Sequence, residues 1–564
     1  ARSMNIDDIT AKGLPNQLTS PNILCTTTTS REQKMMAATR TMFTVRPTSR
    51  ILPLSRMSLT SAVPATLGSR SYHSSTTIGM TSSSSFVDNS NNAAIEFDQI
   101  CELASSNLRF GPGSTAEVGQ DLDFMNARNV IIVTDQTVEQ LPPMQVLQES
   151  LDRHNINYKI FNQVRVEPND VSFQNAINYF QKYKSSSGPY DAVIAIGGGS
   201  TIDTAKAANL YATYPPAGDF YDYVNPPLGK GLPIPASSGD DTMPPLIAIP
   251  TTAGTGSETT GVAIFDDTPT KSKTGIAHRK LKPTLGIVDP NNTKTMPSSV
   301  AKFSGLDVLC HAIESYTALP FNKRPKPTSS IHRPAYQGSN PISDIWSLFA
   351  LQATAKYLRR AVVTASSHDD DDDDDDEEAR TQMLIASSAA GMGFGNAGVH
   401  LCHGMSYPIA SQVKQMQHSV GSTNNNETIY KPEGYKIDET GHYLVPHGLS
   451  VIVNAPSVFE FTGVADRDRH ATCARILKQA RMNDDATYFP KPSPDTGRWL
   501  ADEIRYLMDD LKVPMGLKSF GYDIDDIPSL VEGTLPQHRV TKLSPRPITR
   551  RDLEDLFLNV YNES

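Results

Sequence analysis

Apolar and polar positions follow different patterns in the two halves of this 564-residue chain. In the first half, short runs that are almost wholly apolar alternate with longer stretches of helical periodicity. A wholly apolar run suits a strand that is buried on both faces of a sheet. Because such strands alternate with helices, the pattern predicts an α/β domain with a largely parallel sheet over residues 93–290. The expected strands are 129–135, 159–161, 191–196, 246–250 and 285–290.

After residue 290 the apolar residues recur at helical spacing, and few strand-like runs remain. We therefore expect an all-α domain over residues 291–564, which makes the chain α/β plus all-α. The expected helical segments are 305–314, 346–361, 382–390, 499–511 and 551–560.

Two stretches interrupt the helical half. Residues 320–342 are rich in proline, serine and arginine, and we expect them to cross the surface as an irregular excursion. Residues 368–378 contain eight consecutive aspartates followed by two glutamates, and such a block of like charges favours a solvated loop. Calcium binding is the alternative, but the tract lacks the glycine and the mixed ligands of a formed calcium loop.

Residues 1–92 differ in composition from the rest of the chain. Between Gln33 and Val87 there is no aspartate or glutamate, but six lysines and arginines lie among many serines and threonines. A basic, serine-rich and acid-poor segment is typical of a mitochondrial transit peptide, which predicts a location in the mitochondrial matrix. A plain disordered tail is the alternative.

The overall composition excludes two classes of partner. The formal net charge of −10 includes the acidic tract, and basic residues do not gather with aromatic ones, so we expect no nucleic-acid partner. No window approaches the roughly 20 apolar residues that a membrane helix needs, so we expect no membrane span. The five cysteines are scattered without CxxC spacing, as in proteins of reducing compartments.

A glycine-rich turn follows the expected strand 191–196. Gly197, Gly198 and Gly199 lead into a helix that Ser200 opens. Glycines let the backbone approach a diphosphate, and the free amides at the start of a helix bind its charge. The turn therefore indicates a nucleotide site, with tight packing that needs no ligand as the alternative.

Two further features point to the same edge of the sheet. The segment 250–258 follows another buried strand and is rich in hydroxyl groups, and ligands bind at the carboxyl ends of such strands. Asp135, at the end of the first expected strand, is placed to accept hydrogen bonds from ribose hydroxyls. Because its charge would repel a 2′-phosphate, we expect NAD rather than NADP.

An aspartate and a histidine lie one turn apart on the expected helix 305–314. Asp307 and His311 are four residues apart, so both project from one face. They would supply two ligands of a metal site, for which His400, His403 and His447 are later candidates. A simple contact on the helix surface is the alternative for the first pair.

Taken together and in order, these motifs resemble the iron-containing alcohol dehydrogenase family over about residues 95–564. Further segments are similar to its mitochondrial hydroxyacid-oxoacid transhydrogenase branch. The family motifs are GGGSxxD at 197–203, PTTAGTGSE at 250–258, GxDxLxHAxE at 305–314, HGM with a later proline at 403–408, and PHG at 446–448. The branch-like segments are 333–341, 396–408 and 533–537.

The resemblance implies an α/β NAD-binding domain, a helical metal-binding domain and an active site in the cleft between them. It implies four ligands, one carboxylate and three imidazoles, which suit Fe²⁺ or Zn²⁺ acting as a Lewis acid. The implied ligands and catalytic residues are Asp307, His311, His403 and His447. The implied cofactor neighbours are Gly198, Gly199, Ser200, Asp203, Thr251, Thr252, Thr255, Ser257 and Lys273.

The chain departs from the family at three positions. Tyr407 stands where many relatives have a second histidine near the nicotinamide, which makes it a candidate substrate residue. His400 is not a ligand throughout the family, and we expect it to support the metal site, face the substrate or serve the fold. Glu167 replaces the usual asparagine of a PNP turn, and we assign it no role.

The branch resemblance implies hydride transfer from 4-hydroxybutyrate to 2-oxoglutarate through bound NAD, giving succinate semialdehyde and 2-hydroxyglutarate. Both substrates carry a carboxylate, so a basic clamp is expected, and Arg333 is the candidate. An anchoring role for Arg333 in its loop is the alternative.

Two other functions remain open at this point. One is an ordinary NAD-dependent alcohol dehydrogenase that releases NADH, and the other is a metal-stabilised binding protein without catalysis. The expected partners are small hydroxyacids and oxoacids, and assembly into a homo-oligomer is also left open.

Overall fold

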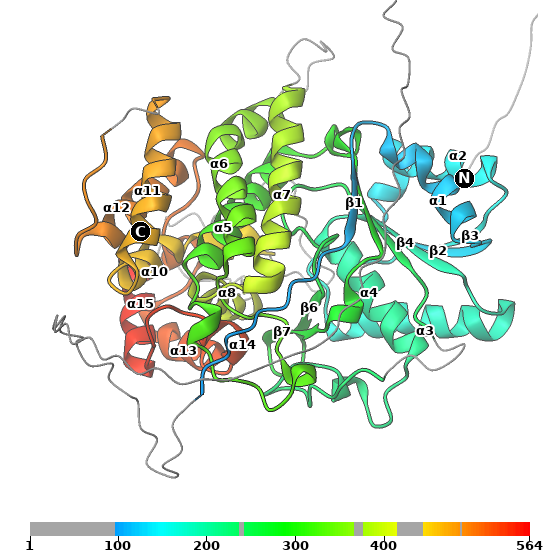
Figure 1. Cartoon of the computed structure of the whole chain (residues 1–564), viewed down its shortest axis with the longest axis horizontal. Coiled ribbons are helices and arrows are strands. Elements are labelled where there is room, and N and C mark those ends of the chain that lie inside the picture. The colour runs from blue at the N-terminus through cyan, green and yellow to red at the C-terminus, as the bar shows by residue number, and fades with distance from the viewer. Residues whose placement is uncertain (1–95, 236–241, 366–375, 414–443, 485–487, 564) are drawn as a thin grey trace, which may run out of the picture. The chain divides into compact units, whose positions relative to one another are not determined.

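The apolar runs of the first half form a six-stranded sheet (Figure 1). The computed structural model describes residues 96–235, 242–365, 376–413, 444–484 and 488–563. Within them the strand order is β1-β8-β5-β4-β2-β3, and each neighbouring pair is parallel. The strands are β1 (Asn107–Phe110), β2 (Asn129–Val133), β3 (Asn157–Phe161), β4 (Ala192–Gly197), β5 (Leu246–Pro250) and β8 (Leu285–Val288).

Side chains of the inner strands alternate between two hydrophobic cores, one on each face of the sheet. Val130 and Ile132 of β2 belong to the core that contains α1 and α2. Ile131 and Val133 belong to the core that contains α3 and α4. Burial on both faces explains why these strands are almost wholly apolar. The helices are α1 (Val118–Phe124), α2 (Pro142–Arg153), α3 (Asp170–Ser187) and α4 (Gly199–Thr213).

The structure confirms the predicted α/β region with its five strands and adds elements that the apolar pattern did not indicate. Strand β1 is short and has exposed ends, so it carries no apolar run. The hairpin of β6 (Val262–Asp267) and β7 (Ser272–Ala277) is antiparallel and separate from the main sheet. Its strands alternate buried and less buried residues, which gives a weaker sequence signal than a wholly apolar run.

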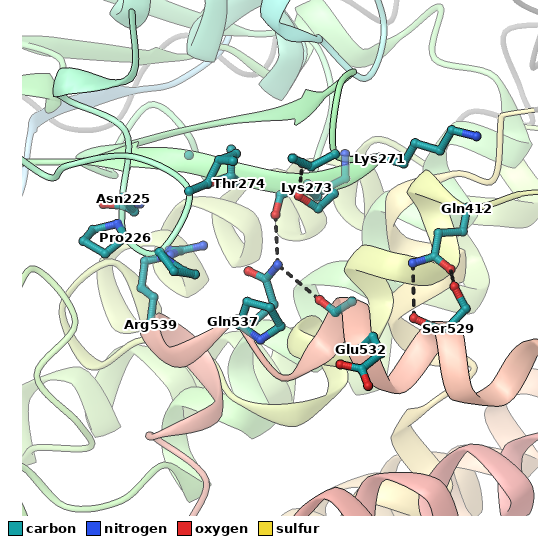
Figure 2. A pocket seen from close by; sticks show the side chains of 17 residues that line it. Asn225, Pro226, Lys271, Lys273, Thr274, Gln412, Ser529, Glu532, Gln537 and Arg539 are labelled. Carbon is teal, nitrogen blue, oxygen red and sulfur yellow. Dashed lines mark hydrogen bonds between the residues drawn. The ribbon is translucent and has the colours of Figure 1, made fainter.

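The β6–β7 hairpin packs against the C-terminal helices and so joins the two halves of the chain. The side-chain amide of Gln537 donates to the carbonyl of Lys273 on β7 at 3.2 Å (Figure 2). A cavity of about 280 Å³ lies between the hairpin, the turn at 225–228 and the helices α13 (Ile527–Thr534) and α14 (His538–Thr541). All residues that the structure describes belong to one compact unit.

The second half is helical, as predicted. Its central helix, α5, packs against α6, α7 and α9. The helices are α5 (Ser298–Thr317), α6 (Pro341–Thr364), α7 (Glu377–Ala397), α8 (Leu401–Ser411), α9 (His447–Ile452), α10 (Ala455–Thr462), α11 (Arg467–Met482), α12 (Thr496–Asp510), α13 (Ile527–Thr534), α14 (His538–Thr541) and α15 (Arg550–Asn562).

Part of the acidic tract is helical rather than a loop. Residues 368–375 lie outside the described residues, but Glu377 and Glu378 form the first turn of α7. Asp376 caps this helix by accepting a hydrogen bond from the backbone N–H of Ala379 at 3.0 Å. Negative charges stabilise the N-terminus of a helix, so the end of the acidic run begins a helix that the loop prediction missed.

The excursion 320–342 is only partly on the surface. Its end, from Tyr336 to Asn340, is buried, and α6 begins at Pro341. Gly338 donates its backbone N–H to the carbonyl of Ala397 at 2.9 Å, which ties this stretch to the end of α7. The prediction of a surface segment was therefore wrong for these residues, because polar and proline-rich composition does not report such backbone contacts.

The expected transit region, residues 1–92, lies outside the described residues. Among the residues that the structure describes, no helix is both long and apolar enough to cross a membrane.

Candidate active site

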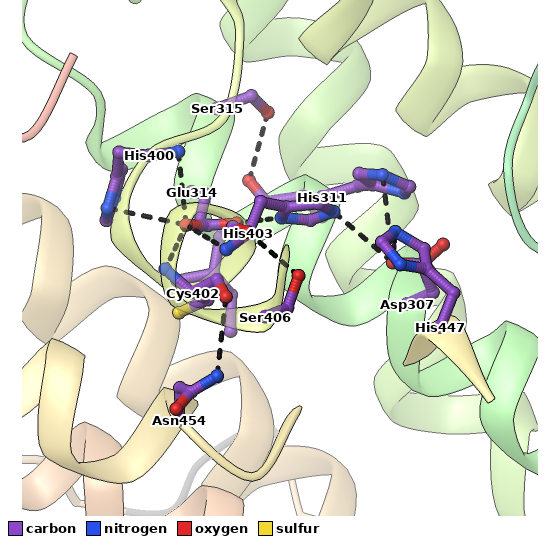
Figure 3. A network of polar contacts seen from close by, with 12 residues as sticks. Asp307, His311, Glu314, Ser315, His400, Cys402, His403, Ser406, His447 and Asn454 are labelled. Carbon is purple, nitrogen blue, oxygen red and sulfur yellow. Dashed lines mark hydrogen bonds and ion pairs between the residues drawn. The ribbon is translucent and has the colours of Figure 1, made fainter. Parts of the chain in front are cut away.

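Four ligand-type side chains from three helices meet around one oxygen atom (Figure 3). Asp307 and His311 lie one turn apart on α5, His403 lies in α8, and His447 is the first residue of α9. These four residues are called the quartet below. The Nε2 atoms of His403, His311 and His447 lie 3.4, 3.7 and 3.8 Å from Oδ1 of Asp307. Ligands arranged tetrahedrally at about 2.1 Å from an ion are roughly 3.4 Å apart, so these separations suit one divalent ion.

The hydrogen bonding of the quartet supports the same conclusion. Oδ1 of Asp307 and Nε2 of His403 are buried and have no hydrogen-bond partner among the described residues. Buried polar atoms without partners are rare in native proteins, and here they converge on one point. Asp307, His403 and His447 offer ligand atoms that all lie within 4.8 Å of one another. The residues therefore fit a divalent metal.

The electrostatics of the quartet favour a cation. Burial would raise the pKa of Asp307, but the surrounding imidazoles bring it well below its usual range. Burial lowers the pKa of His311 to about 3 and also lowers that of His447, so both imidazoles are neutral and free to act as ligands. His403 differs, because Glu314 and Asp307 outweigh its burial and raise its pKa, so a metal ion must displace a proton there. The ionised carboxylate of Asp307 beside the two neutral imidazoles attracts a positive ion.

Glu314 orients His403 from behind and was not identified from the sequence. Its carboxylate accepts a short hydrogen bond from Nδ1 of His403, which leaves Nε2 facing Asp307. It also accepts from the backbone N–H of Cys402 at 2.7 Å and of His400 at 3.1 Å, at the start of α8. Burial would raise the pKa of Glu314, but His403, His400 and the backbone amide of Cys402 lower it to about 2. A carboxylate behind a histidine ligand fixes its ring orientation and tautomer.

Two packing contacts hold the quartet in place. The ring of Phe394 stacks on that of His311, with centroids 3.9 Å apart and planes 9° apart. Gly448 lets α9 approach α5, since a Cβ atom there would lie 1.9 Å from the carbonyl oxygen of Phe303. This close approach brings the neighbouring His447 to Asp307.

The glycine-rich turn lies against the hydroxyl-rich segment, as the sequence suggested. Gly198 precedes α4, and a Cβ atom at Gly199 would lie 2.4 Å from the side chain of Thr255. Asp203, one turn into α4, accepts a hydrogen bond from Ser257 and another from the backbone N–H of Ile264 at 2.9 Å. Gly199, Ser200 and Asp203, in the first turns of α4, line a cavity.

Lys273 of β7 lies between two carboxylates. Its ammonium group is 2.8 Å from Glu167 and 3.2 Å from Asp266. Burial disfavours the charge, but these two carboxylates outweigh it and raise the pKa of Lys273. Glu167, to which the sequence gave no role, is therefore the counter-ion of a predicted cofactor residue.

Both groups of residues line one cavity of about 110 Å³. The lining of this cavity contains the whole quartet, Tyr407, and six of the residues that the sequence predicted as neighbours of the cofactor. These are Asp307, His311, His403, His447, Gly199, Ser200, Asp203, Thr255, Ser257, Lys273 and Tyr407. The lining also includes Glu167, Tyr336, Phe394 and Arg539, which were not predicted.

Several predicted residues do not line this cavity. Gly198, Thr251 and Thr252 lie in the two turns beside it, and Thr252 would be 3.3 Å from a Cβ atom at Gly198. Asp135 accepts hydrogen bonds from two backbone N–H groups of its own turn, at 2.8 and 2.9 Å. Its contact with ribose remains a prediction.

His400 and Arg333 also lie away from the cavity. His400 is fully buried, with Nε2 3.1 Å from the hydroxyl of Thr317. Its pKa is lowered to about 4 by burial. Nε of Arg333 is 3.0 Å from the carboxylate of Asp98, a contact that anchors its segment.

Only weak sequence signals marked the missed residues. Glu314 is the last residue of the GxDxLxHAxE motif, and Arg539 follows the branch-like segment 533–537 by two positions. The sequence does not reveal the contact partner of either residue. Glu314 contacts residues of α8 and Arg539 contacts Tyr407, and in each case the partner is far away along the chain.

Comparisons with known proteins support the resemblance that the motifs indicated. A family model described as "Iron-containing alcohol dehydrogenase" matches residues 105–290. A second, described as "Fe-containing alcohol dehydrogenase family, C-terminal", matches residues 335–424 and 436–561.

Three curated relatives illustrate the similarity. Proteins named "Hydroxyacid-oxoacid transhydrogenase, mitochondrial" from Mus musculus and Bos taurus are 51% and 50% identical over 467 residues, which is 82% of this chain and 90% of each relative. A "Probable hydroxyacid-oxoacid transhydrogenase, mitochondrial" from Dictyostelium discoideum is 47% identical over 471 residues, covering 82% of this chain and 79% of the relative.

Two solved structures share the fold. A 1,3-propanediol oxidoreductase and an alcohol dehydrogenase from Oenococcus oeni superpose with TM-scores of 0.64 and 0.63. Both are 22% identical, and the match covers 82% of this chain and all of the other. Together with the parallel sheet and the helical half, these matches confirm the predicted fold class.

Proposed function

This chain belongs to the iron-containing alcohol dehydrogenase family of oxidoreductases, and on that premise we propose that it transfers hydride from a hydroxyacid to an oxoacid through bound NAD. The observation that carries the proposal is the single cavity lined by both the four-ligand site and the nucleotide-type turns. Hydride chemistry on a hydroxyl group needs both elements beside the same carbon atom.

The relatives supply the substrate class. Their names combine the words hydroxyacid, oxoacid and transhydrogenase, and the match to each covers more than four fifths of this chain. We propose 4-hydroxybutyrate as the donor and 2-oxoglutarate as the acceptor, with succinate semialdehyde and 2-hydroxyglutarate as products. The two half-reactions balance, since each donates or accepts one hydride and one proton.

Residues on one side of the cavity would bind the metal ion, and residues on the other side would bind the dinucleotide. Asp307, His311, His403 and His447 would hold Fe²⁺ or Zn²⁺, and this ion would polarise the substrate oxygen as a Lewis acid. On the other side, the amides at the start of α4 would bind the diphosphate of the dinucleotide.

Apolar side chains complete the cavity. Val262, Ile264, Phe394 and Val399 line it between the two polar sides. Such residues exclude water from the reacting carbon and strengthen the electrostatic interactions around it. They would also contact the carbon chain of a substrate.

We place the reaction in the mitochondrial matrix. The basic, acid-poor composition of residues 1–92 and the mitochondrial relatives both support this location.

A deuterium-transfer experiment tests the proposal. Purified, metal-loaded protein is mixed with 2-oxoglutarate and 4-hydroxybutyrate that carries deuterium on its reacting carbon, with no free NAD. We expect deuterium on C2 of 2-hydroxyglutarate, and an excess of unlabelled NADH should not dilute it. His403→Ala, which removes a ligand, should lower the rate at least about 100-fold.

Two outcomes would contradict the proposal. If product forms only with added NAD while NADH accumulates, the chain is an ordinary alcohol dehydrogenase. If the metal-loaded protein transfers no deuterium from any hydroxyacid or alcohol, it is a binding protein without catalysis.

A further inference from the structure

Two cationic side chains, a lysine and an arginine, line the cavity of about 110 Å³ that contains the quartet. Within the described ranges, only the lysine has a carboxylate partner. Lys273 is already held by Glu167 and Asp266. The second cationic side chain is Arg539, and no aspartate or glutamate among the described residues forms an ion pair with it. Arginine cannot lose its proton in a protein, so its positive charge must be stabilised in another way.

The contacts of Arg539 leave part of its guanidinium group unsatisfied. Nη2 donates a hydrogen bond to the hydroxyl of Tyr407 at 2.8 Å. The guanidinium carbon lies 4.9 Å from the centre of the Tyr336 ring, a cation–π contact. Nη1 is closed off from solvent and has no hydrogen-bond partner in the part of the chain that the structure describes.

Arg539 is half-buried, but a charged N–H group such as its Nη1, closed off from solvent and unpaired, is unfavourable unless a ligand satisfies it. The planar fork of a guanidinium group matches the geometry of carboxylate and phosphate oxygens. The geometry of Arg539 therefore suits an acidic ligand in the same cavity as the four-ligand site.

Tyr407 adds a second donor beside the first. Its hydroxyl oxygen accepts from Arg539, so its own proton is free to point to another acceptor. The phenol O–H and Nη1 of Arg539 can then each donate to a ligand.

The position of Tyr407 relates this donor pair to the reacting centre. Tyr407 and His403 are four residues apart on α8, which places them on one face and roughly 6 Å apart along the helix. The apolar Phe394 and Val399 line the cavity with them. A ligand whose oxygen lies at the metal ligands could thus extend a short carbon chain toward Arg539.

We propose that Arg539 and Tyr407 bind the carboxylate of the hydroxyacid and oxoacid substrates and so select acids over neutral alcohols. This assignment rests on the proposed function and replaces Arg333, whose side chain is paired with Asp98. Arg539 also lines the larger cavity beside the β6–β7 hairpin, and Pro226 is another lining residue of that cavity (Figure 2). The carboxylate site is therefore at the junction of the two cavities.

The test measures selectivity within a single turnover. Enzyme with bound NAD is mixed with 4-hydroxybutyrate or with 1-butanol, and reduction of the nicotinamide is followed by absorbance. Arg539→Met should slow reduction by 4-hydroxybutyrate about 100-fold at subsaturating concentration, while the rate with 1-butanol stays within about twofold. Tyr407→Phe should shift the same ratio in the same direction but less, because only one neutral donor is lost.

Two further variants refine the test. Arg539→Lys keeps the charge without the fork and should fall between wild type and Arg539→Met. Arg498→Met, which removes an exposed arginine of α12, should leave both rates unchanged. Arg539→Lys also covers the case in which Arg539→Met does not fold.

The outcomes separate this inference from the function on which it rests. If the wild type uses 4-hydroxybutyrate but both substrates slow equally in the folded Arg539 variants, or neither slows, the carboxylate role is wrong and the transhydrogenase proposal stands. If the wild type reduces its NAD with 1-butanol but not with 4-hydroxybutyrate, both proposals are wrong.

Discussion

Glu314 shows how much of this site depends on one buried side chain. Its carboxylate accepts hydrogen bonds from the His403 ring and from backbone N–H groups at the start of α8. It therefore fixes both the imidazole and the helix that carries it. A histidine ligand without such a partner can rotate or change tautomer, which weakens its bond to a metal.

Glu314→Gln should lower metal affinity by about 10- to 100-fold, because a neutral amide no longer supports the His403 tautomer. Affinity is measured by competition with a chelator, and the melting temperature of the metal-free protein is recorded in parallel. Glu460→Gln, the same change at an exposed position of α10, is the control and should keep the wild-type affinity. Equal affinities for Glu314→Gln and wild type would contradict the positioning role.

At the scale of single residues, the sequence predicted those that belong to a recognisable pattern within one segment. Asp307 and His311 were accessible because helical spacing alone puts them on one face. The glutamate behind His403 and the arginine beside Tyr407 were not, since each contact joins residues far apart along the chain. The expectation for Arg333 came from a segment motif, and a motif does not state which way a side chain points.

At the scale of elements, the position of α9 depends on the lack of a side chain at Gly448. The helix begins at His447, and its second residue lies against the backbone of α5. The ligand and the contact that places it are thus adjacent in sequence. In the PHG motif, the histidine is the ligand, and the glycine after it has no Cβ atom, so α9 can pack close enough to α5 for the histidine to reach Asp307.

Gly448→Ala should move α9 away from α5, because the new Cβ atom would overlap the Phe303 carbonyl and lie 3.2 Å from Cβ of Asp307. We expect a loss of about 1–3 kcal/mol in the free energy of unfolding and at least tenfold weaker metal binding. Chemical denaturation and chelator competition measure the two effects. Gly395→Ala in α7 has its nearest neighbour at 3.4 Å and should show neither. Unchanged metal binding in Gly448→Ala would show that α9 tolerates displacement.

Elements with burial on both faces were the easiest to predict. Strands β4 and β5 are fully buried and appear in the sequence as continuous apolar runs. The β6–β7 hairpin was missed although it carries Lys273, because a hairpin depends on cross-strand pairing and leaves only a weak local pattern. The buried end of the stretch 320–342 was missed for a similar reason.

For the whole molecule, buried histidines outside the site make stability depend on pH. His470 of α11 is fully buried, with Nδ1 donating to the carbonyl of Asp466 at 2.7 Å and Nε2 2.9 Å from the Thr462 hydroxyl. Burial lowers the pKa of His470 to about 4. In the unfolded chain an ordinary histidine has a pKa near 6.5, so below that pH the unfolded state binds an additional proton.

Stability from His470 is therefore complete above about pH 6.5 and declines as the pH falls toward 4, by about 1 kcal/mol per pH unit. His470→Gln removes this titration and should reduce the fall in melting temperature between pH 6.5 and pH 5. Both proteins are measured without metal, so that loss of the ion does not contribute. Parallel pH profiles for the two proteins would assign the acid sensitivity to other groups.

The quartet also has a consequence for how the molecule is held together. Its four side chains come from helices that are distant in the chain, so an ion bound there joins α5, α8 and α9 as a reversible cross-link. Like any cross-link, it removes conformations mainly from the unfolded ensemble, and its effect depends on the free concentration of the ion. The supply of metal would thus determine the lifetime of the folded enzyme as well as its rate of turnover.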